Sequence, residues 1–148
     1  MTLPRIISTG FGIGYFGKGG GTLAAIASCL VWHFTGGNNL FIACAVTFFV
    51  TGIGVWSADK VEAEWGVDSS RVVIDEIAGM CVSLLFLPIT PTVIVAGLIL
   101  FRFFDIVKPL YIRRTEQLPG GWGVMADDIL AGIYTNIILQ VAVKFSVL

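Results

Sequence analysis

The chain has 148 residues, of which 56% are hydrophobic and only 13% are charged, and its mean hydropathy is +0.90. A soluble domain usually carries about twice that share of charged residues, so the composition predicts an integral membrane protein that forms a single domain over residues 1–148. The net charge of −1 and the lack of a basic stripe exclude a nucleic-acid partner.

Five apolar stretches follow one another along the chain, and we interpret each as a membrane-spanning helix. They cover residues 22–34, 40–56, 72–87, 92–104 and 129–148. Several are shorter than the roughly 20 residues that a straight transmembrane helix needs, so we expect them to extend into neighbouring polar segments or to tilt in a thinned bilayer. The predicted fold class is all-α, a polytopic helical membrane bundle with about five transmembrane helices.

The connections between these stretches alternate in charge. Residues 35–39 (TGGNN) and 88–91 (PITP) are short and uncharged, as expected for tight turns between antiparallel helices. The charged segments are the N-terminus, residues 58–71 and residues 105–128, and an even number of crossings between them gathers all three at one face. The positive-inside rule makes that face cytoplasmic and puts the C-terminus outside. We interpret 58–71 as a solvated amphipathic connector, in which Asp59 is the acid most worth testing.

Acidic side chains stand at three predicted helix ends on this charged face. They are Asp75 and Glu76, then Asp105, then Asp127 and Asp128, the last two opening the final helix. Gly79 and Gly132 follow Glu76 and Asp128 by about one helical turn, so neighbouring helices can approach closely beside these acids. Several converging carboxylates suit Mg²⁺, and the sequence has no His and Cys cluster suited to zinc. The alternative, which the residues leave open, is that the acids only neutralise nearby basic side chains.

Basic residues flank these acids. They are Arg102, Lys108, Arg113 and Arg114. A site that holds both a divalent cation and cationic side chains is suited to a phosphate group, and Lys or Arg can offset the charge that develops on a leaving ester oxygen. Arg102 and Lys108 are the stronger candidates, because Arg113 and Arg114 would equally well anchor the chain at lipid headgroups.

Other phosphatase nucleophiles are missing from the sequence. The single histidine, His33, falls on the opposite predicted face, no cysteine has an arginine six positions later, and no D-x-D motif is present. Water activated by a metal ion is the chemistry that remains.

The glycine-rich segment 10–22 (GFGIGYFGKGGGT) contains a near match to a nucleotide-binding P-loop. The match fails because Gly19 stands where Ser or Thr would hold Mg²⁺, and no strand precedes it. We expect this segment to lie at the membrane surface, with Lys18 facing the phosphate and Thr22 acting as the N-cap of the first span.

Four blocks of the sequence resemble the successive signatures of the bacterial phosphatidylglycerophosphatase A family. They are TGFGIGY, DSSRVVIDEIAGM, FRFFDIVKPLYIRR and GGWGVMADDILAG, in that order, between about residues 9 and 132. The resemblance implies a Mg²⁺-dependent phosphoric monoester hydrolase in the bacterial inner membrane. It implies that the substrate is a bilayer phospholipid, phosphatidylglycerophosphate, which is hydrolysed to phosphatidylglycerol and inorganic phosphate.

The resemblance, together with the residue patterns, gives each candidate a role. The catalytic residues would be Asp75, Glu76, Arg102, Asp105, Lys108, Asp127 and Asp128; the phosphate-binding residues would be Lys18, Thr22, Arg102, Lys108 and Arg113; and the metal ligands would come from Glu76, Asp127, Asp128 and Asp75. Asp105 would orient Arg102 and Lys108, since it lies three residues from each, or would equally well be a metal ligand or the general base.

The chain also departs from the family pattern at two places. Residues 17–22 read GKGGGT where the family has a Pro-x-x-Pro-Gly-Thr loop, and Glu116-Gln117 replace an Asp-Arg pair. Two other classes fit a small membrane protein with clustered acids, namely a phosphotransferase acting on CDP-lipids and a non-enzymatic cation carrier. The D-G-x₂-A-R motif of the first is absent, and the acids gather at one face rather than spreading through the membrane as the second requires.

Overall fold

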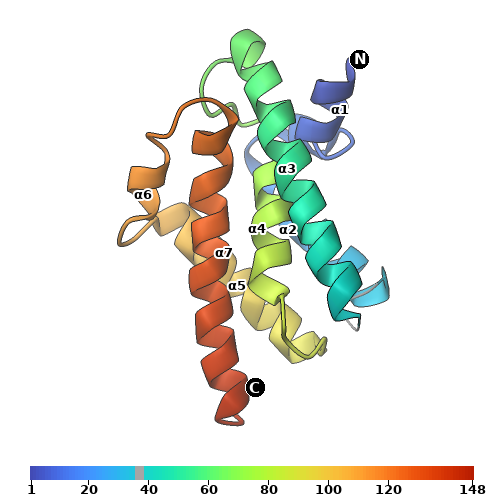
Figure 1. The fold of residues 1–148 in the computed structure, drawn as a ribbon, viewed down its shortest axis with the longest axis vertical. Helices are drawn as coiled ribbons and strands as arrows, with labels where there is room; N and C mark the ends of the chain where they lie inside the picture. The colour runs from blue at the N-terminus through green and yellow to red at the C-terminus, as the bar shows by residue number, and fades with distance from the viewer. Residues whose placement is uncertain (36–38) are drawn as a thin grey trace.

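The computed structural model describes residues 1–35 and 39–148, and every regular element in these ranges is helical. The elements in chain order are α1 (Leu3–Ser8), the 3-10 helix η1 (Ile13–Gly19), α2 (Gly20–Thr35), α3 (Leu40–Trp65), α4 (Ile74–Leu84), α5 (Pro91–Val107), α6 (Ile112–Thr115) and α7 (Gly121–Lys144) (Figure 1). The all-α prediction is therefore confirmed. Of the two predicted turns, 88–91 lies where the chain enters α5, and Pro91 is already the first residue of that helix. The other, 35–39, includes residues 36–38, which lie outside the described residues.

Helix α4 lies at the centre of the bundle, where it packs against α2, α3, α5 and most extensively α7 (Figure 1). Two glycines allow α4 and α7 to touch backbone to backbone. A Cβ atom on Gly132 would lie 2.5 Å from the carbonyl oxygen of Gly79, and one on Gly79 would lie 2.8 Å from the carbonyl oxygen of Asp128. Small residues permit such close helix packing, so the close approach expected from the sequence is present and brings the acids of the two helices together.

Two helices, α3 and α7, are long and apolar enough to cross a bilayer. The others in the described ranges are shorter, with 16 residues in α2, 17 in α5 and 11 in α4. The 11 residues of α4 rise only about 16 Å, against a hydrocarbon thickness of roughly 30 Å. Five complete crossings therefore remain a prediction, and the described residues support two candidate spans.

The C-terminal end of the short α4 is held by two side chains of α7. The side-chain amide of Asn136 donates hydrogen bonds to the carbonyl oxygens of Ser83 (3.0 Å) and Leu85 (2.7 Å), and that of Gln140 donates to those of Leu85 (3.3 Å) and Phe86 (3.2 Å). The last carbonyls of a helix have no partner within it. These amides supply partners from α7 and so fix α4 against that helix.

Helix α3 runs beyond its apolar stretch, which was expected to end at residue 56, and continues to Trp65. The first half of the predicted connector 58–71 is thus helical, and the helix ends where Gly66 takes a positive φ of 82°. Near this end, Arg5 of α1 pairs with Glu64 at 2.5 Å. The pair is too exposed to contribute much stability, but it shows that the N-terminal segment and residues 58–65 lie at the same end of the bundle.

Two helix starts also differ from the prediction. Helix α7 begins at Gly121, so Asp127 and Asp128 lie about two turns inside it rather than at its start. Helix α2 begins at Gly20, so Thr22 lies within it and is not its N-cap. The apolar stretches mark only the part of each helix that avoids water, and the helical backbone continues past them because polar side chains at this end face a cavity or solvent.

Candidate active site

A polar cavity of about 240 Å³ lies at the charged end of the bundle. Its walls come from the glycine-rich segment, the segment before α4, the start of α4, the end of α5 and the second turn of α7. The lining residues are Gly17, Lys18, Gly21, Asp68, Ser69, Ser70, Val72, Asp75, Glu76, Arg102, Asp105, Lys108, Asp127 and Asp128. Segments far apart in the sequence therefore meet at one end, as the alternation of charge predicted.

Three acids form the centre of this cavity. One carboxylate oxygen each from Asp75, Glu76 and Asp128 lie within 4.8 Å of one another. Asp75 is 8% exposed and Asp128 is 2% exposed. An oxygen on each of the three side chains is buried without a hydrogen-bond partner among the described residues. Crowded, buried carboxylates are costly unless a cation is shared between them, and hard oxygen ligands are those that Mg²⁺ prefers. The donor set thus fits a magnesium ion.

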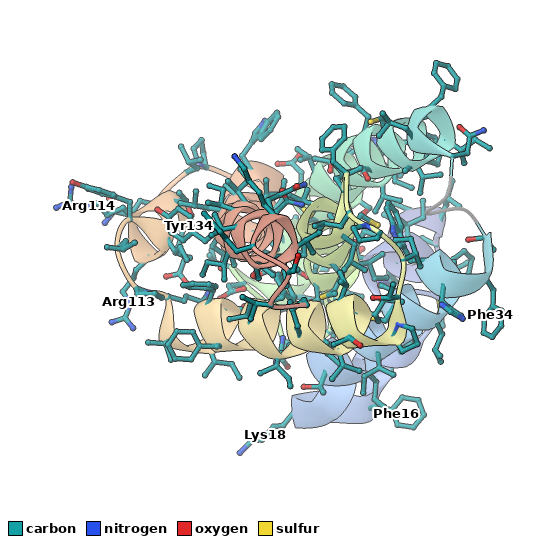
Figure 2. All side chains as sticks on the ribbon, turned by 90° about the horizontal axis from the view of Figure 1, so that it is seen from below. Phe16, Lys18, Phe34, Arg113, Arg114 and Tyr134 are labelled. Atoms are coloured by element: carbon teal, nitrogen blue, oxygen red, sulfur yellow. The ribbon has the colours of Figure 1, made fainter. Side chains whose placement is uncertain are left out.

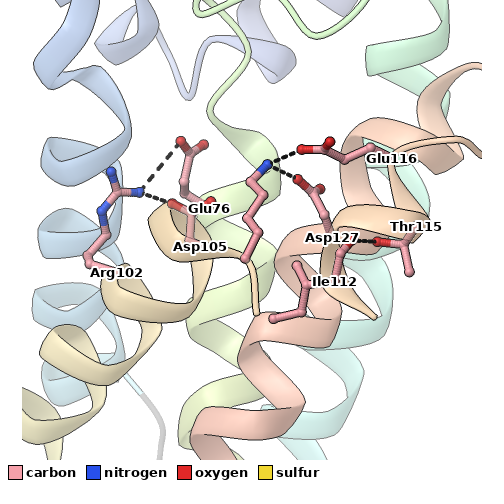
Figure 3. Close-up of polar contacts among 8 residues, drawn as sticks. Glu76, Arg102, Asp105, Ile112, Thr115, Glu116 and Asp127 are labelled. Carbon is pink, nitrogen blue, oxygen red and sulfur yellow. Dashed lines mark hydrogen bonds and ion pairs between the residues drawn. The ribbon is translucent and has the colours of Figure 1, made fainter. Parts of the chain in front are cut away.

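Arg102 lies beside this acidic group and is oriented by a neighbour on its own helix (Figure 3). Its Nη1 atom donates to Asp105 Oδ2 and lies 3.9 Å from Glu76 Oε1. The Arg102 Nε atom is buried and has no hydrogen-bond partner in the described part of the chain. The guanidinium group is therefore held in place at the cavity wall, where its positive charge suits the binding of an anion.

Lys108 is placed differently from the sequence expectation, because it contacts Asp127 and Glu116 rather than Asp105 (Figure 3). Its Nζ atom lies 2.6 Å from Asp127 Oδ2 and also donates to Glu116 Oε1. Helix α5 ends at Val107, and Lys108 takes a left-handed φ of 49°, so the three-residue spacing from Asp105 no longer puts both on one helix face. Burial alone would lower the pKa of Lys108, but the two carboxylates outweigh it and raise the pKa above its usual value.

Asp127 and Asp128 thus contact different groups, although they are adjacent in the sequence. Side chains of neighbouring helical residues point about 100° apart. Asp128 joins Asp75 and Glu76, whereas one oxygen of Asp127 is bonded to Lys108. Of the four expected metal ligands, three lie in one group, and the fourth, Asp127, instead accepts a hydrogen bond from Lys108. The other oxygen of Asp127, Oδ1, is buried and has no hydrogen-bond partner within residues 1–35 and 39–148.

The model of the phosphatidylglycerophosphatase A family matches residues 6–143. The chain belongs to the phosphatidylglycerophosphatase A family. Two named members support this. The phosphatidylglycerophosphatase A of Haemophilus influenzae is 34% identical over 91% of this chain and 85% of its own length. The phosphatidylglycerophosphatase A of Escherichia coli is 31% identical over 91% of this chain and 80% of its own length. A Bacteroides thetaiotaomicron protein, provisionally named a phosphatidylinositol-3-phosphatase, is 41% identical over 95% of this chain and 93% of its own.

No solved structure matches the chain. Membership of the phosphatidylglycerophosphatase A family confirms the resemblance seen in the four sequence blocks, and it makes the protein an enzyme of the phosphoric monoester hydrolase class with lipid phosphatase activity.

The glycine-rich segment packs tightly against residues near the cavity at two of its glycines. A Cβ atom on Gly14 would lie 1.9 Å from the carbonyl oxygen of Arg71, and one on Gly21 would lie 2.1 Å from Glu76 Oε1. Glycine at these two places lets the backbone reach residues that frame the acidic group. These contacts come from Gly14 and Gly21 and not from Gly17, where an added Cβ atom would meet nothing within 4 Å.

The remaining predicted phosphate-binding residues lie at or beyond the rim. Lys18 lines the cavity but is exposed, and its side chain points outward in Figure 2. Thr22 and Arg113 are exposed and are not among the lining residues, and Arg113 extends away from the bundle (Figure 2). Asp59 also lies outside the lining, close against Gly120.

Four residues of the site were not predicted from the sequence. Asp68, Ser69 and Ser70 line the cavity, and Glu116 pairs with Lys108. The serines stand in the block DSSRVVIDEIAGM, so their position just before the acidic pair was the available signal. Glu116 reaches the site through the segment between α5 and α7, and no regular spacing connects it to Lys108.

Proposed function

We propose that the protein hydrolyses the terminal phosphate monoester of phosphatidylglycerophosphate, yielding phosphatidylglycerol and inorganic phosphate, with Mg²⁺ as its cofactor. The observation that carries this proposal is the group of three carboxylates with unpartnered oxygens beside two cationic side chains in one cavity. The names of the Haemophilus influenzae and Escherichia coli relatives support the choice of lipid.

Asp75, Glu76 and Asp128 would hold the metal ion, because their carboxylate oxygens converge within 4.8 Å. Bound there, Mg²⁺ would polarise a phosphoryl oxygen and make a water molecule more acidic. Arg102, which lines the cavity, would bind a second phosphoryl oxygen through its guanidinium group, while Asp105 keeps that group in place. A fixed cation needs no reorganisation when negative charge develops on phosphorus.

Asp127 and Lys108 would handle the proton and the leaving group. Asp127 Oδ1, which is buried and unpartnered, would accept a proton from the water that attacks phosphorus. As that bond forms, the bond between phosphorus and the glycerol oxygen breaks, and Lys108 Nζ would offset the charge on the departing oxygen. The proton that Asp127 accepted would pass to that oxygen, which becomes the hydroxyl of phosphatidylglycerol. The raised pKa of Lys108 keeps it positively charged at neutral pH, which suits this role.

A second substrate is favoured by one specific observation. The Bacteroides thetaiotaomicron relative, at 41% identity, carries a name that specifies phosphatidylinositol-3-phosphate. Both lipids present a phosphate monoester on a hydroxyl-bearing headgroup, and Ser69 and Ser70 in the cavity wall could bond such hydroxyls.

The deciding experiment compares phosphate release from both lipids by purified protein in detergent, with Mg²⁺ and with EDTA. We expect faster release from phosphatidylglycerophosphate, loss of release in EDTA, and recovery when Mg²⁺ is restored. Faster release from phosphatidylinositol-3-phosphate would replace the substrate, and full activity in EDTA would overturn the role of the metal. Release from neither lipid would refute the proposal.

We also propose that the protein lies in the bacterial inner membrane with several crossings and that its cavity faces the cytoplasm. Three basic side chains, Lys18, Arg102 and Lys108, line the cavity, and the positive-inside rule favours the inner face for a basic end of the bundle. Reporter fusions at Glu116 and at the C-terminus test this. The first should report the cytoplasm and the second the periplasm, and the reverse result would overturn the orientation.

A further inference from the structure

An apolar groove of about 360 Å³ lies between α2 and α3, with α4 as its floor. Its walls include Ala27 and Val31 of α2, Val46 and Val50 of α3, and Ile77 and Cys81 of α4. Helices α2 and α3 each pack against α4, but in the described residues they make few contacts with each other. The volume is in the range of pockets that hold small molecules, and almost all of the wall is apolar.

The groove begins beside the polar cavity and runs away from it. Ile77 of the groove directly follows Glu76 of the cavity, and Ala24 of the groove lies one turn after Gly21 of the cavity. From Ala24 to Thr35 the groove follows α2, a distance of about 16 Å at the helical rise. The groove and the cavity share no lining residue, but their walls are adjacent on both α2 and α4.

We propose that this groove holds one acyl chain of the lipid whose phosphate group enters the cavity. The proposal rests on the function proposed above, because it assumes that the cavity receives a lipid phosphate. A molecule that places a phosphate beside Arg102 and continues into the groove must be amphiphilic, with its apolar part directed toward the opposite end of the bundle. A bilayer phospholipid has this form, and α3, one wall of the groove, is a candidate membrane span.

The contribution of the groove is orientation rather than attraction. A lipid tail is already in apolar surroundings, so moving it onto Val, Ile and Ala side chains gains little transfer energy. Fixing the chain instead restricts where the phosphate group can lie, and a misplacement of about 1 Å can slow a reaction on the order of a hundredfold. The groove should therefore affect turnover of long-chain lipids far more than turnover of short-chain ones.

The first test fills the groove and varies the chain length. Ala27→Phe adds a ring from α2, Val46→Phe adds one from α3, and Ala142→Phe on α7, which does not line the groove, is the matched control. The substrates are dipalmitoyl and dibutyryl phosphatidylglycerophosphate in mixed micelles. We expect the wild type and the control to prefer the long chain by on the order of tenfold in kcat/KM. Both groove variants should lose this preference and hydrolyse the short-chain lipid at the wild-type rate.

The second test follows binding without turnover. Trp32 lines the groove, and the replacements Trp56→Phe, Trp65→Phe and Trp122→Phe leave it as the only tryptophan. Phosphatidylglycerol with brominated acyl chains, added in an unbrominated detergent, should quench Trp32 fluorescence with saturation. Adding Ala27→Phe should abolish the saturable part.

The two tests separate failure of the groove from failure of the proposed function. Hydrolysis with the same chain-length preference in Ala27→Phe, with quenching that only follows the lipid fraction of the micelle, would overturn the groove and leave the hydrolase intact. Saturable quenching without hydrolysis of either substrate would support an acyl site and refute the proposed function. A wild-type dimer that Val46→Phe dissociates would show that a second copy covers the groove, and would overturn the proposal.

Discussion

The contact between Gly21 and Glu76 makes Gly21→Ala the most informative single change. A Cβ atom at this position would lie 2.1 Å from Glu76 Oε1 and 3.4 Å from Arg102 Nη1. Ordinary contact requires the carboxylate to retreat by more than 1 Å, which removes it from the group it forms with Asp75 and Asp128. A displacement of this size in a catalytic group can cost on the order of a hundredfold in rate, or about 3 kcal/mol of transition-state stabilisation. The flexible end of Glu76 can move, so the fold should survive.

The assay measures kcat/KM for phosphate release from phosphatidylglycerophosphate together with the thermal midpoint of unfolding. Gly19→Ala is the matched control, since a Cβ atom there would meet nothing within 4 Å. We expect Gly21→Ala to lose about a hundredfold in kcat/KM and to need more Mg²⁺ for half-maximal rate, with a melting temperature close to that of the control. Wild-type turnover in Gly21→Ala, or an equal loss in Gly19→Ala, would refute the assignment of Glu76 to the metal site.

Three further predictions concern charge and packing. Asp128→Asn should abolish Mg²⁺-dependent phosphate release yet raise the melting temperature in EDTA, by about 2–4 °C per kcal/mol of relieved repulsion; a variant that is both active and unchanged in stability would contradict this. Lys108→Met should stop turnover and destabilise the protein by about 3 kcal/mol, because it leaves the buried Asp127 carboxylate without its cation. Adding Asp127→Asn should then restore most of the stability but not the activity, and a double variant as unstable as Lys108→Met would argue against the pair. Gly132→Ala should lower the melting temperature, since its Cβ would lie 2.5 Å from a carbonyl oxygen of α4, whereas Gly52→Ala, which has open space around it, should raise stability by about 1 kcal/mol. Equal melting temperatures for these two glycine variants would show that the close packing of α4 and α7 contributes nothing.

The convergence of the acids could be predicted from the sequence because it follows from topology. Charged segments separated by pairs of apolar stretches must meet at one end of a bundle, and the glycines that follow Glu76 and Asp128 indicated where α4 and α7 touch. The pairing of Arg102 with Asp105 was also predictable, since three-residue spacing on a continuous helix brings side chains together.

The different contacts of Asp127 and Asp128 could not be predicted in the same way. Helical periodicity shows that the two side chains diverge, but which one faces α4 depends on the rotation of α7 in the bundle, and tertiary packing sets that rotation. The contacts of Lys108 were mispredicted because the end of α5 at Val107 breaks the helical spacing. The length of α4 was also overestimated, because hydropathy alone does not distinguish its 11 helical residues from the apolar residues that follow them.

The amide bonds from Asn136 and Gln140 to the end of α4 have a consequence for how deeply that end can be immersed. A turn is normally excluded from the hydrocarbon region of a bilayer because its unpaired peptide groups would have no hydrogen-bond partners there. With the carbonyl oxygens of Ser83, Leu85 and Phe86 already bonded to α7, the reversal after α4 can sit below the level of the lipid headgroups. The helix that carries Asp75 and Glu76 can therefore be less than half the length of α3 and α7 and still have its far end surrounded by hydrocarbon.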